Sequence, residues 1–175
     1  MSHFKGSVAA YVVVNEPFKR TREPGGGTQP LREHELRPGP YTPSDLKDSC
    51  WKKILGEGYI AKAFTYASEA DPDALLIMND SFNGSRGYDR IMQDKFMELT
   101  RKLKAQGVPI HAVGTQMHLD ASTNRAGLPT LPPTYLEDFR DLLKKGQEIG
   151  VQVHVTEMDV YVPAGMYPDP AHTTG

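Results

Sequence analysis

Two short apolar runs that each end in a glutamate constrain this sequence more than any other feature. The first, residues 10–17, reads A-Y-V-V-V-N-E-P, and the second, residues 151–159, reads V-Q-V-H-V-T-E-M-D. Valine-rich runs of this length favour buried β-strands. A buried strand that ends in a glutamate places a carboxylate at the rim of a core. We therefore expect Glu16 and Glu157 to form an acid/base pair on a rigid scaffold.

The rest of the chain alternates between apolar runs and segments of helical periodicity. Strands separated by helices at this spacing are typical of βαβ units, in which the strands pair in parallel and helices cover the sheet. The sequence therefore predicts an α/β fold built on a parallel sheet. The predicted strands are 8–15, 74–78, 110–116 and 151–159, and the predicted helices are about 57–69, 89–106 and 134–148, with a short turn before the first helix.

Two segments are predicted to be loops. Residues 19–49 contain recurrent proline and glycine, which exclude a long regular element. Residues 162–175 form the C-terminal loop. Loops as long as the first one are often functional in compact domains.

Length, charge and cysteine content narrow the function classes. The 175 residues fit one domain or a large part of one, and the formal net charge of −2 comes without a polybasic run, so nucleic acid is a poor partner. No apolar run approaches the ~20 residues that span a bilayer, so we expect no membrane partner. The single cysteine, Cys50, excludes an internal disulfide framework, and we expect it to be buried and inert. We also expect Trp51 to lie in the core.

Polar residues follow every predicted strand. In α/β barrels and open parallel sheets, active sites lie at the carboxyl ends of the strands. Four such coincidences in one chain favour an enzyme. The polar clusters, in chain order, are Asn15-Glu16, Asn79-Asp80, Gln116 with His118, and Glu157 with Asp159.

A pair of glutamates suits glycosidic cleavage, which needs one carboxylic acid at the leaving oxygen and one carboxylate across the sugar. His118 could set the charge of a neighbouring carboxylate, and Asp159 could orient His118. Simpler interpretations stay open: a single glutamate at a strand end is commonly solvated, and a single histidine is commonly structural. Asn79-Asp80 fits a turn and helix cap equally well.

A metal site is the chemical alternative. His111, His154 and the site residues include good ligand types. However, strand alternation puts His111 and His154 on the face opposite Glu157 and His118. The HExxH spacing of a zinc protease does not occur either. The pattern therefore disfavours a metal, and we expect no cofactor.

Four ordered segments resemble one known family. They read V-V-V-N-E-P-F, L-G-E-G-Y-I-A-K-A-F-T-Y-A-S-E-A-D-P-D-A-L-L-I-M-N-D, G-V-P-I-H-A-V-G-T-Q-M-H-L and V-Q-V-H-V-T-E-M-D-V. Over residues 3–163 the chain resembles glycoside hydrolase family 10, the retaining endo-β-1,4-xylanases. The resemblance implies a (β/α)8 barrel, of which residues 1–175 would carry about half, strands four to seven, as a partial catalytic domain.

The resemblance also implies roles for the site residues. Glu16 matches the general acid/base and Glu157 the nucleophile. His118 and Asp159 match the hydrogen-bonded pair behind the nucleophile. The residues that match substrate-binding positions are Asn15, Gln116 and Asn79.

The same resemblance suggests the partners. It implies xylan or xylo-oligosaccharide as substrate and a secreted, extracellular protein. The chain departs from the family in having Tyr11-Val12 where the family usually has Trp-Asp, and Ser81 where an aromatic residue is usual. With half the strands missing, we expect a homo-oligomer or assembly with the other barrel half. The alternative function is a non-catalytic partial barrel that binds polysaccharide, or one that is active only when assembled.

Overall fold

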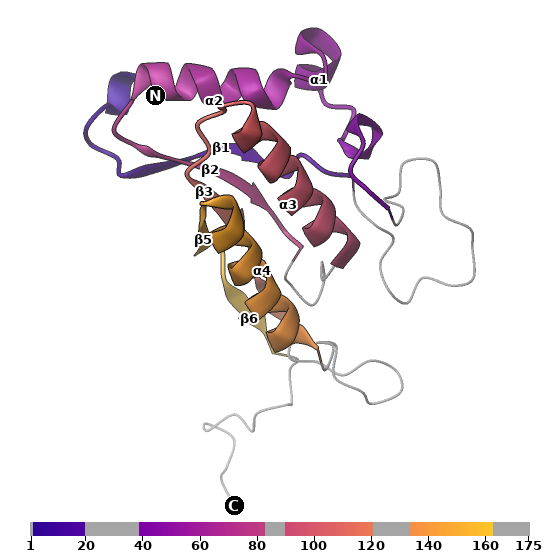
Figure 1. Ribbon diagram of the computed structural model, residues 1–175. Helices are drawn as coiled ribbons and strands as arrows, with labels where there is room; N and C mark the ends of the chain where they lie inside the picture. Colours follow the sequence, from indigo (N-terminus) through magenta and orange to yellow (C-terminus); the bar gives the residue numbers. More distant parts are fainter. Residues whose placement is uncertain (1, 20–38, 83–89, 121–133, 163–175) are drawn as a thin grey trace, which may run out of the picture.

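A parallel sheet of four strands forms the centre of the molecule. The computed structural model describes residues 2–19, 39–82, 90–120 and 134–162 (Figure 1). The strands pair in the order β1-β2-β3-β5, and β4 pairs with β6 in a separate two-stranded ladder. Their bounds are β1 Ala10–Asn15, β2 Leu75–Asp80, β3 Ala112–Thr115, β4 His118–Asp120, β5 Gln152–Val155 and β6 Asp159–Tyr161.

Helices connect the strands of the sheet, as the sequence predicts. The helices are α1 Cys50–Leu55, α2 Tyr59–Ala70, α3 Arg90–Ala105 and α4 Tyr135–Ile149, with short 3-10 helices η1 Ser2–Phe4 and η2 Pro43–Asp45. Every pairing in the four-stranded sheet is parallel. The carboxyl ends of its strands therefore lie along one edge, and the predicted α/β architecture is confirmed.

Helices α3 and α4 lie side by side over the sheet, and α2 runs beside β1 and β2 (Figure 1). The apolar stripe of α3 packs into the core, where Met92 and Phe96 are almost completely buried. Arg90 of α3 donates to Asp138 at 2.7 Å and to Asp141 of α4, which joins the two helices at their surface. The sheet edge that carries polar residues is therefore backed by a packed layer.

The helix ends follow their sequence signals. Asp71, which precedes Pro72, caps the end of α2. Gly150 ends α4 in the left-handed region with φ of 75°, which glycine adopts without a steric cost. The strands β1, β3 and β5 are shorter than predicted, and the three-residue strands β4 and β6 were not predicted. Such short strands carry too few residues for a period-2 pattern to be recognised.

The described part of the long loop packs into the core. Phe18 and Leu46 form an isolated antiparallel bridge, and both side chains are fully buried. Lys95 of α3 contacts Asp45 at 2.8 Å in a buried ion pair. The segment 39–49 is therefore an anchored strap across the beginning of α3. Residues 20–38 of the predicted loop, and 163–175 of the C-terminal loop, lie outside the described residues.

The outer strands of the sheet are exposed, which corrects two predictions. Trp51 was expected in the core but is 62% exposed, whereas Phe64 is fully buried. Cys50 was expected to be buried and is exposed. Trp51 lines a cavity with Val13 of β1, the outer strand of the sheet, and no further strand of the described chain pairs with β1 on that side. Cys50 begins α1, in which no residue is buried. Within the described residues, no helix has the length and apolar character needed to cross a membrane.

Candidate active site

The carboxyl ends of the four sheet strands bring the predicted site residues together. Asn15 ends β1 and pairs in register with Asn79 of β2. Gln116 directly follows β3, and Glu157 follows β5 with Thr156 in between. Parallel pairing puts these positions at one edge, so residues up to 142 positions apart in the chain, such as Asn15 and Glu157, share one site.

Asn79 lies at the centre of the site and is fully buried. Its Nδ2 donates to Asn15 Oδ1 at 2.9 Å and to Glu157 Oε1 at 3.0 Å. Its Oδ1 accepts from Thr156 Oγ1 at 2.9 Å. Both amide hydrogens and the carbonyl oxygen of Asn79 therefore have partners, and the side chain is fixed from all sides.

Glu16 receives two donors of different kinds. Gln116 Nε2 donates to Glu16 Oε1 at 3.0 Å and lies 3.3 Å from Asn15 Oδ1. Lys47 Nζ donates to Glu16 Oε2 at 3.0 Å. The Glu16 side chain is 31% exposed, so it is held firmly but still reaches solvent.

Glu157 is contacted by a histidine, whereas Glu16 is contacted by a lysine. His118 Nε2 lies 3.4 Å from Glu157 Oε2, and His118 Nδ1 lies 3.1 Å from Asp159 Oδ2. The backbone explains this arrangement, because His118 and Asp159 are paired residues in the β4–β6 ladder. The two short strands that sequence reasoning missed thus position the histidine and aspartate that it predicted.

The predicted site residues form one continuous network in the structure. Asn79 and Gln116 are buried amides within it, so their contacts are with the other site residues; direct contact with a substrate stays a prediction. In order along the hydrogen bonds and ion pairs, the network runs Glu16, Gln116, Asn15, Asn79, Glu157, His118, Asp159.

Backbone strain marks the same edge. Glu16 has φ of 49° and Met117 has φ of 59°, a left-handed conformation that costs a non-glycine residue about 1–3 kcal/mol. The amide of Glu16 donates to the carbonyl of Asn79 at 2.8 Å, which holds this conformation. Each of the two residues turns the chain sharply just after a strand. Strain of this kind concentrates at functional sites, which supports the assignment of this edge as the active site.

Three further residues belong to the site and were not predicted. Lys47 comes from the long loop, Thr156 supports Asn79, and Gly114 leaves room for Asn79. A Cβ added at Gly114 would lie 2.3 Å from Asn79 Oδ1 and 2.9 Å from Thr156 Cγ2. A glycine inside a strand is a signal of such close approach, so Gly114 could have been recognised from the sequence. Lys47 gave no such signal.

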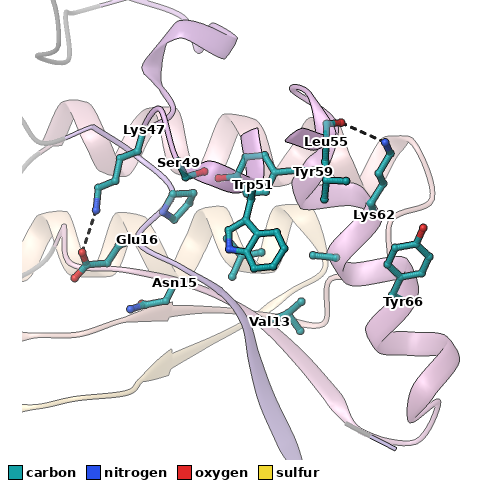
Figure 2. Close-up of a pocket in the computed structure, with 13 residues that line it drawn as sticks. Val13, Asn15, Glu16, Lys47, Ser49, Trp51, Leu55, Tyr59, Lys62 and Tyr66 are labelled. Carbon is teal, nitrogen blue, oxygen red and sulfur yellow. Dashed lines mark hydrogen bonds and ion pairs between the residues drawn. The ribbon is translucent and has the colours of Figure 1, made fainter. Parts of the chain in front are cut away.

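A cavity of about 460 Å³ adjoins Glu16 (Figure 2). Lys47 and Glu16 line one end of it, and Trp51 and Tyr66 line its apolar side. Burial raises the pKa of Tyr59, another lining residue, so its phenol stays neutral at ordinary pH. An aromatic wall beside a carboxylate suits a ring-shaped polar ligand with apolar faces.

His111 and His154, the other two histidines of the metal hypothesis, have partners outside the site network. His111 Nδ1 accepts from the amide of Leu76 at 3.0 Å, and His154 Nε2 lies 2.8 Å from Gln152 Oε1. In the part of the chain that the structure describes, no three histidine, cysteine or acidic side chains converge as metal ligands.

Comparison with known proteins identifies the family. A profile of glycosyl hydrolase family 10 matches residues 1–172. This chain belongs to glycosyl hydrolase family 10. A β-1,4-xylanase of Dictyoglomus thermophilum is 36% identical over 162 residues, covering 93% of this chain and 36% of that protein.

Solved structures of family 10 agree with the fold. Xylanase 10B of Thermotoga maritima superposes with a TM-score of 0.65 at 32% identity, covering 95% of this chain and 40% of that one. Xylanase 10B of Thermotoga petrophila, solved with xylobiose, gives a TM-score of 0.65 at 30% identity over 97% of this chain and 41% of that one. The family fold is a (β/α)8 barrel, and the parallel sheet described here is part of such a barrel. The chain spans 36–41% of the length of these three relatives.

Proposed function

We propose that this chain carries the catalytic carboxylates of an endo-β-1,4-xylanase that retains anomeric configuration. The single observation that carries the proposal is the network that joins Glu16 to Glu157 through three amides. Membership of the family and the xylanase names of the relatives support the substrate class. In retaining enzymes the two carboxyl groups act about 5 Å apart on opposite sides of the glycosidic bond, which two neighbouring but separately held glutamates can do.

In the first step, Glu157 attacks the anomeric carbon and forms a glycosyl ester, while Glu16 gives its proton to the leaving oxygen. Asn79 and His118 hold the two oxygens of Glu157, which orients the carboxylate for attack. Asn15 Oδ1 accepts from Asn79 and Gln116, so the Asn15 amide nitrogen faces away from them and can donate to a sugar hydroxyl.

In the second step, Glu16 acts as a base. It takes a proton from a water molecule, whose oxygen attacks the anomeric carbon and displaces Glu157 as a carboxylate. Glu16 must therefore change its protonation state twice in each cycle.

The direct test is release of reducing sugar from xylan, followed by identification of the products. We expect xylo-oligosaccharides whose anomeric configuration, read by proton NMR in the first minutes, is retained. The Glu157→Gln chain is the matched control and should release nothing. A folded and completed barrel that releases no sugar from any xylan would contradict the proposal.

The exposed outer strands favour a condition on this activity. Val12 of β1 and Val155 of β5 are 46% and 45% exposed, although both are large apolar residues in strands. We infer that activity requires further barrel strands, supplied by more of the same polypeptide or by a second copy. Sedimentation analysis with and without added strands of a relative tests this: activity that appears only in the complex supports it, and an active compact monomer of the chain contradicts it.

The location is also a proposal. Xylan is a polymer outside the cell, and the family resemblance leads us to propose a secreted protein. Activity and antibody signal in the culture medium, compared with a cytoplasmic marker, would test this. Retention of both in the cell fraction would contradict secretion.

A further inference from the structure

Among the described residues of the long loop, Lys47 contacts the site. Its ammonium donates to Glu16 Oε2 at 3.0 Å, and the two side chains are 36% and 31% exposed. Neither step of the reaction described above uses Lys47. Its distance in sequence from Glu16, 31 residues, makes this contact a product of the fold rather than of local geometry.

The backbone around Lys47 is fixed beside Glu16. The amide of Lys47 donates to the carbonyl of Pro17 at 2.8 Å, and the amide of Lys19 donates to the carbonyl of Asp45 at 2.9 Å. These bonds surround the buried bridge between Phe18 and Leu46. The residues directly after Glu16 and those directly before Lys47 are thus tied together.

A buried ion pair anchors this strap from the other side. Lys95 of α3 contacts Asp45 Oδ2 at 2.8 Å, with side chains only 4% and 10% exposed. Lys95 also donates to the carbonyl of Pro40 at 3.0 Å. A flexible surface lysine contributes little through an ion pair, but a lysine on an anchored strap keeps its cation at one place.

A second lysine of the same cavity shows that the contact is selective. Lys62 lines the cavity with Lys47, yet its ammonium donates to the carbonyl of Leu55 at 3.2 Å. Figure 2 shows the two lysines at opposite ends of the cavity, with only Lys47 joined to Glu16. The chain therefore offers a matched control, since both residues are cations of one cavity and only one contacts the carboxylate.

We propose that Lys47 is a positioning residue that holds Glu16 in its carboxylate form and fixes the direction of its second oxygen. The inference rests on the role of Glu16 in the proposed function. A lysine ammonium can only donate, and so can the Gln116 amide nitrogen on the other oxygen. Protonation of Glu16 removes the negative charge that both donors stabilise, and Lys47, as a charge, opposes it most. Lys47 thereby favours the base that the second step needs.

Among the described contacts, Gln116 donates to Glu16 without carrying a charge. Glu157 connects to Glu16 through three amides, and its charge opposes a second carboxylate in the site. These groups are present in every variant below, so they do not account for a difference between variants. The charged and titratable residues that line the cavity or share the network with Glu16 are Lys47, Tyr59, Lys62, Tyr66, Glu157, His118 and Asp159.

The test follows the titration of Glu16 by carbon NMR in the 175-residue chain, with glutamate labelled at the carboxyl carbon. The Glu16 signal is assigned by its absence in Glu16→Gln. We expect Lys47→Met to raise the titration midpoint by about one pH unit, because the nearby cation is lost. Lys47→Arg should keep the midpoint close to that of the parent, and Lys62→Met should leave it unchanged.

Salt and activity give two independent readouts. In 1 M salt the parent midpoint should rise towards that of Lys47→Met, whereas the variant should hardly respond. In a completed barrel, Lys47→Met should move the alkaline limb of the pH–kcat/KM profile to higher pH, because Glu16 then keeps its proton longer. A purely structural lysine would lower activity at every pH without moving this limb.

Each outcome decides the matter. An unmoved midpoint in Lys47→Met, or an equal shift in Lys62→Met, overturns the inference. Should Lys47→Met fail to fold, the salt series on the parent decides, and a midpoint that ignores salt overturns it. The titration needs no hydrolysis, so failure of the proposed function would show as absent sugar release with this titration still readable.

Discussion

The centre and the two edges of the sheet contribute different chemistry to the same site. The central strands β2 and β3 deliver amides, Asn79 and Gln116, which are 0% and 3% exposed. The outer strands β1 and β5 lead to carboxylates, Glu16 and Glu157, whose side chains are 31% and 43% exposed. The buried amides contact both carboxylates, but no hydrogen bond given by the structure joins the carboxylates directly.

This difference in burial separates the amides that hold the site in place from the carboxylates that would react. Neutral amides tolerate burial when all their hydrogen bonds are made, so the centre of the sheet can hold them rigidly. Ionised carboxylates need solvent or charged partners, so they lie where the sheet ends and Lys47 or His118 can reach them. Substitutions of the carboxylates that follow the outer strands β1 and β5 should therefore affect turnover and leave the fold. Substitutions of the amides from the central strands β2 and β3 should affect both.

The largest effect is expected at Glu157. Glu157→Gln keeps the shape and an oxygen for Asn79 but cannot form the glycosyl ester, so turnover should fall roughly 10⁴-fold or more. The side chain is 43% exposed, and the melting temperature should hardly change. Reducing-sugar release and a thermal melt on the same preparation measure both. Turnover close to that of the parent would contradict the nucleophile role.

Glu16→Ala should come next. Removal of the acid/base should slow xylan hydrolysis about 10²- to 10⁴-fold, because the leaving oxygen is no longer protonated. Aryl xylosides with good leaving groups need no protonation and should react in the first step at nearly the parental rate. Azide should then accelerate the second step, because a small anion needs no general base. An absence of both effects would give Glu16 another role.

Asn79→Ala tests the centre of the sheet. Three partners lose a hydrogen bond at once, so we expect about 1–3 kcal/mol less stability and roughly a hundredfold lower turnover. Gly114→Ala is the companion variant, since its Cβ would displace Asn79 Oδ1 without removing the amide. Denaturant unfolding and kcat, measured on both variants, should change in the same direction. A loss of turnover without any loss of stability would break the distinction between centre and edge.

His118→Ala should have a smaller effect. The loss of the 3.4 Å contact between His118 Nε2 and Glu157 Oε2 should lower kcat about tenfold to a hundredfold. Sugar binding should persist, because Asn15 and the cavity beside Glu16 are untouched. Unchanged kcat would make His118 a structural residue.

The sequence predicted the centre of the sheet better than its edges. The runs that became β2 and β3 are apolar on both faces, and both faces are covered, so pattern and outcome agree. Val155 lies in a similar apolar run, in the outer strand β5, but is 45% exposed. An apolar pattern shows which residues a strand can bury, and not whether a neighbouring strand is present to cover them. Trp51 was misplaced for the same reason.

The site was predictable where function coincides with a strand end. Glu16, Glu157 and His118 follow apolar runs, and family resemblance added their roles. Lys47 could not be found in this way, because it lies in a proline- and glycine-rich segment and meets Glu16 only through the buried Phe18–Leu46 bridge. A contact made by tertiary packing over 31 residues leaves no local pattern to read.

The smallest effect is expected at Trp51, and it separates an uncovered edge from a packed centre. Trp51 is 62% exposed, so Trp51→Ala should change the stability of the chain alone by less than about 0.5 kcal/mol. Phe64→Ala is the matched control: this aromatic of α2 is fully buried, and its loss should cost about 3–5 kcal/mol. Urea unfolding measures both. If the missing barrel strands cover this edge, the cost of Trp51→Ala should grow by a kcal/mol or more once they are supplied, at about 25 cal/mol for each Å² newly buried. An equal small cost in both states would show that the added strands leave Trp51 uncovered.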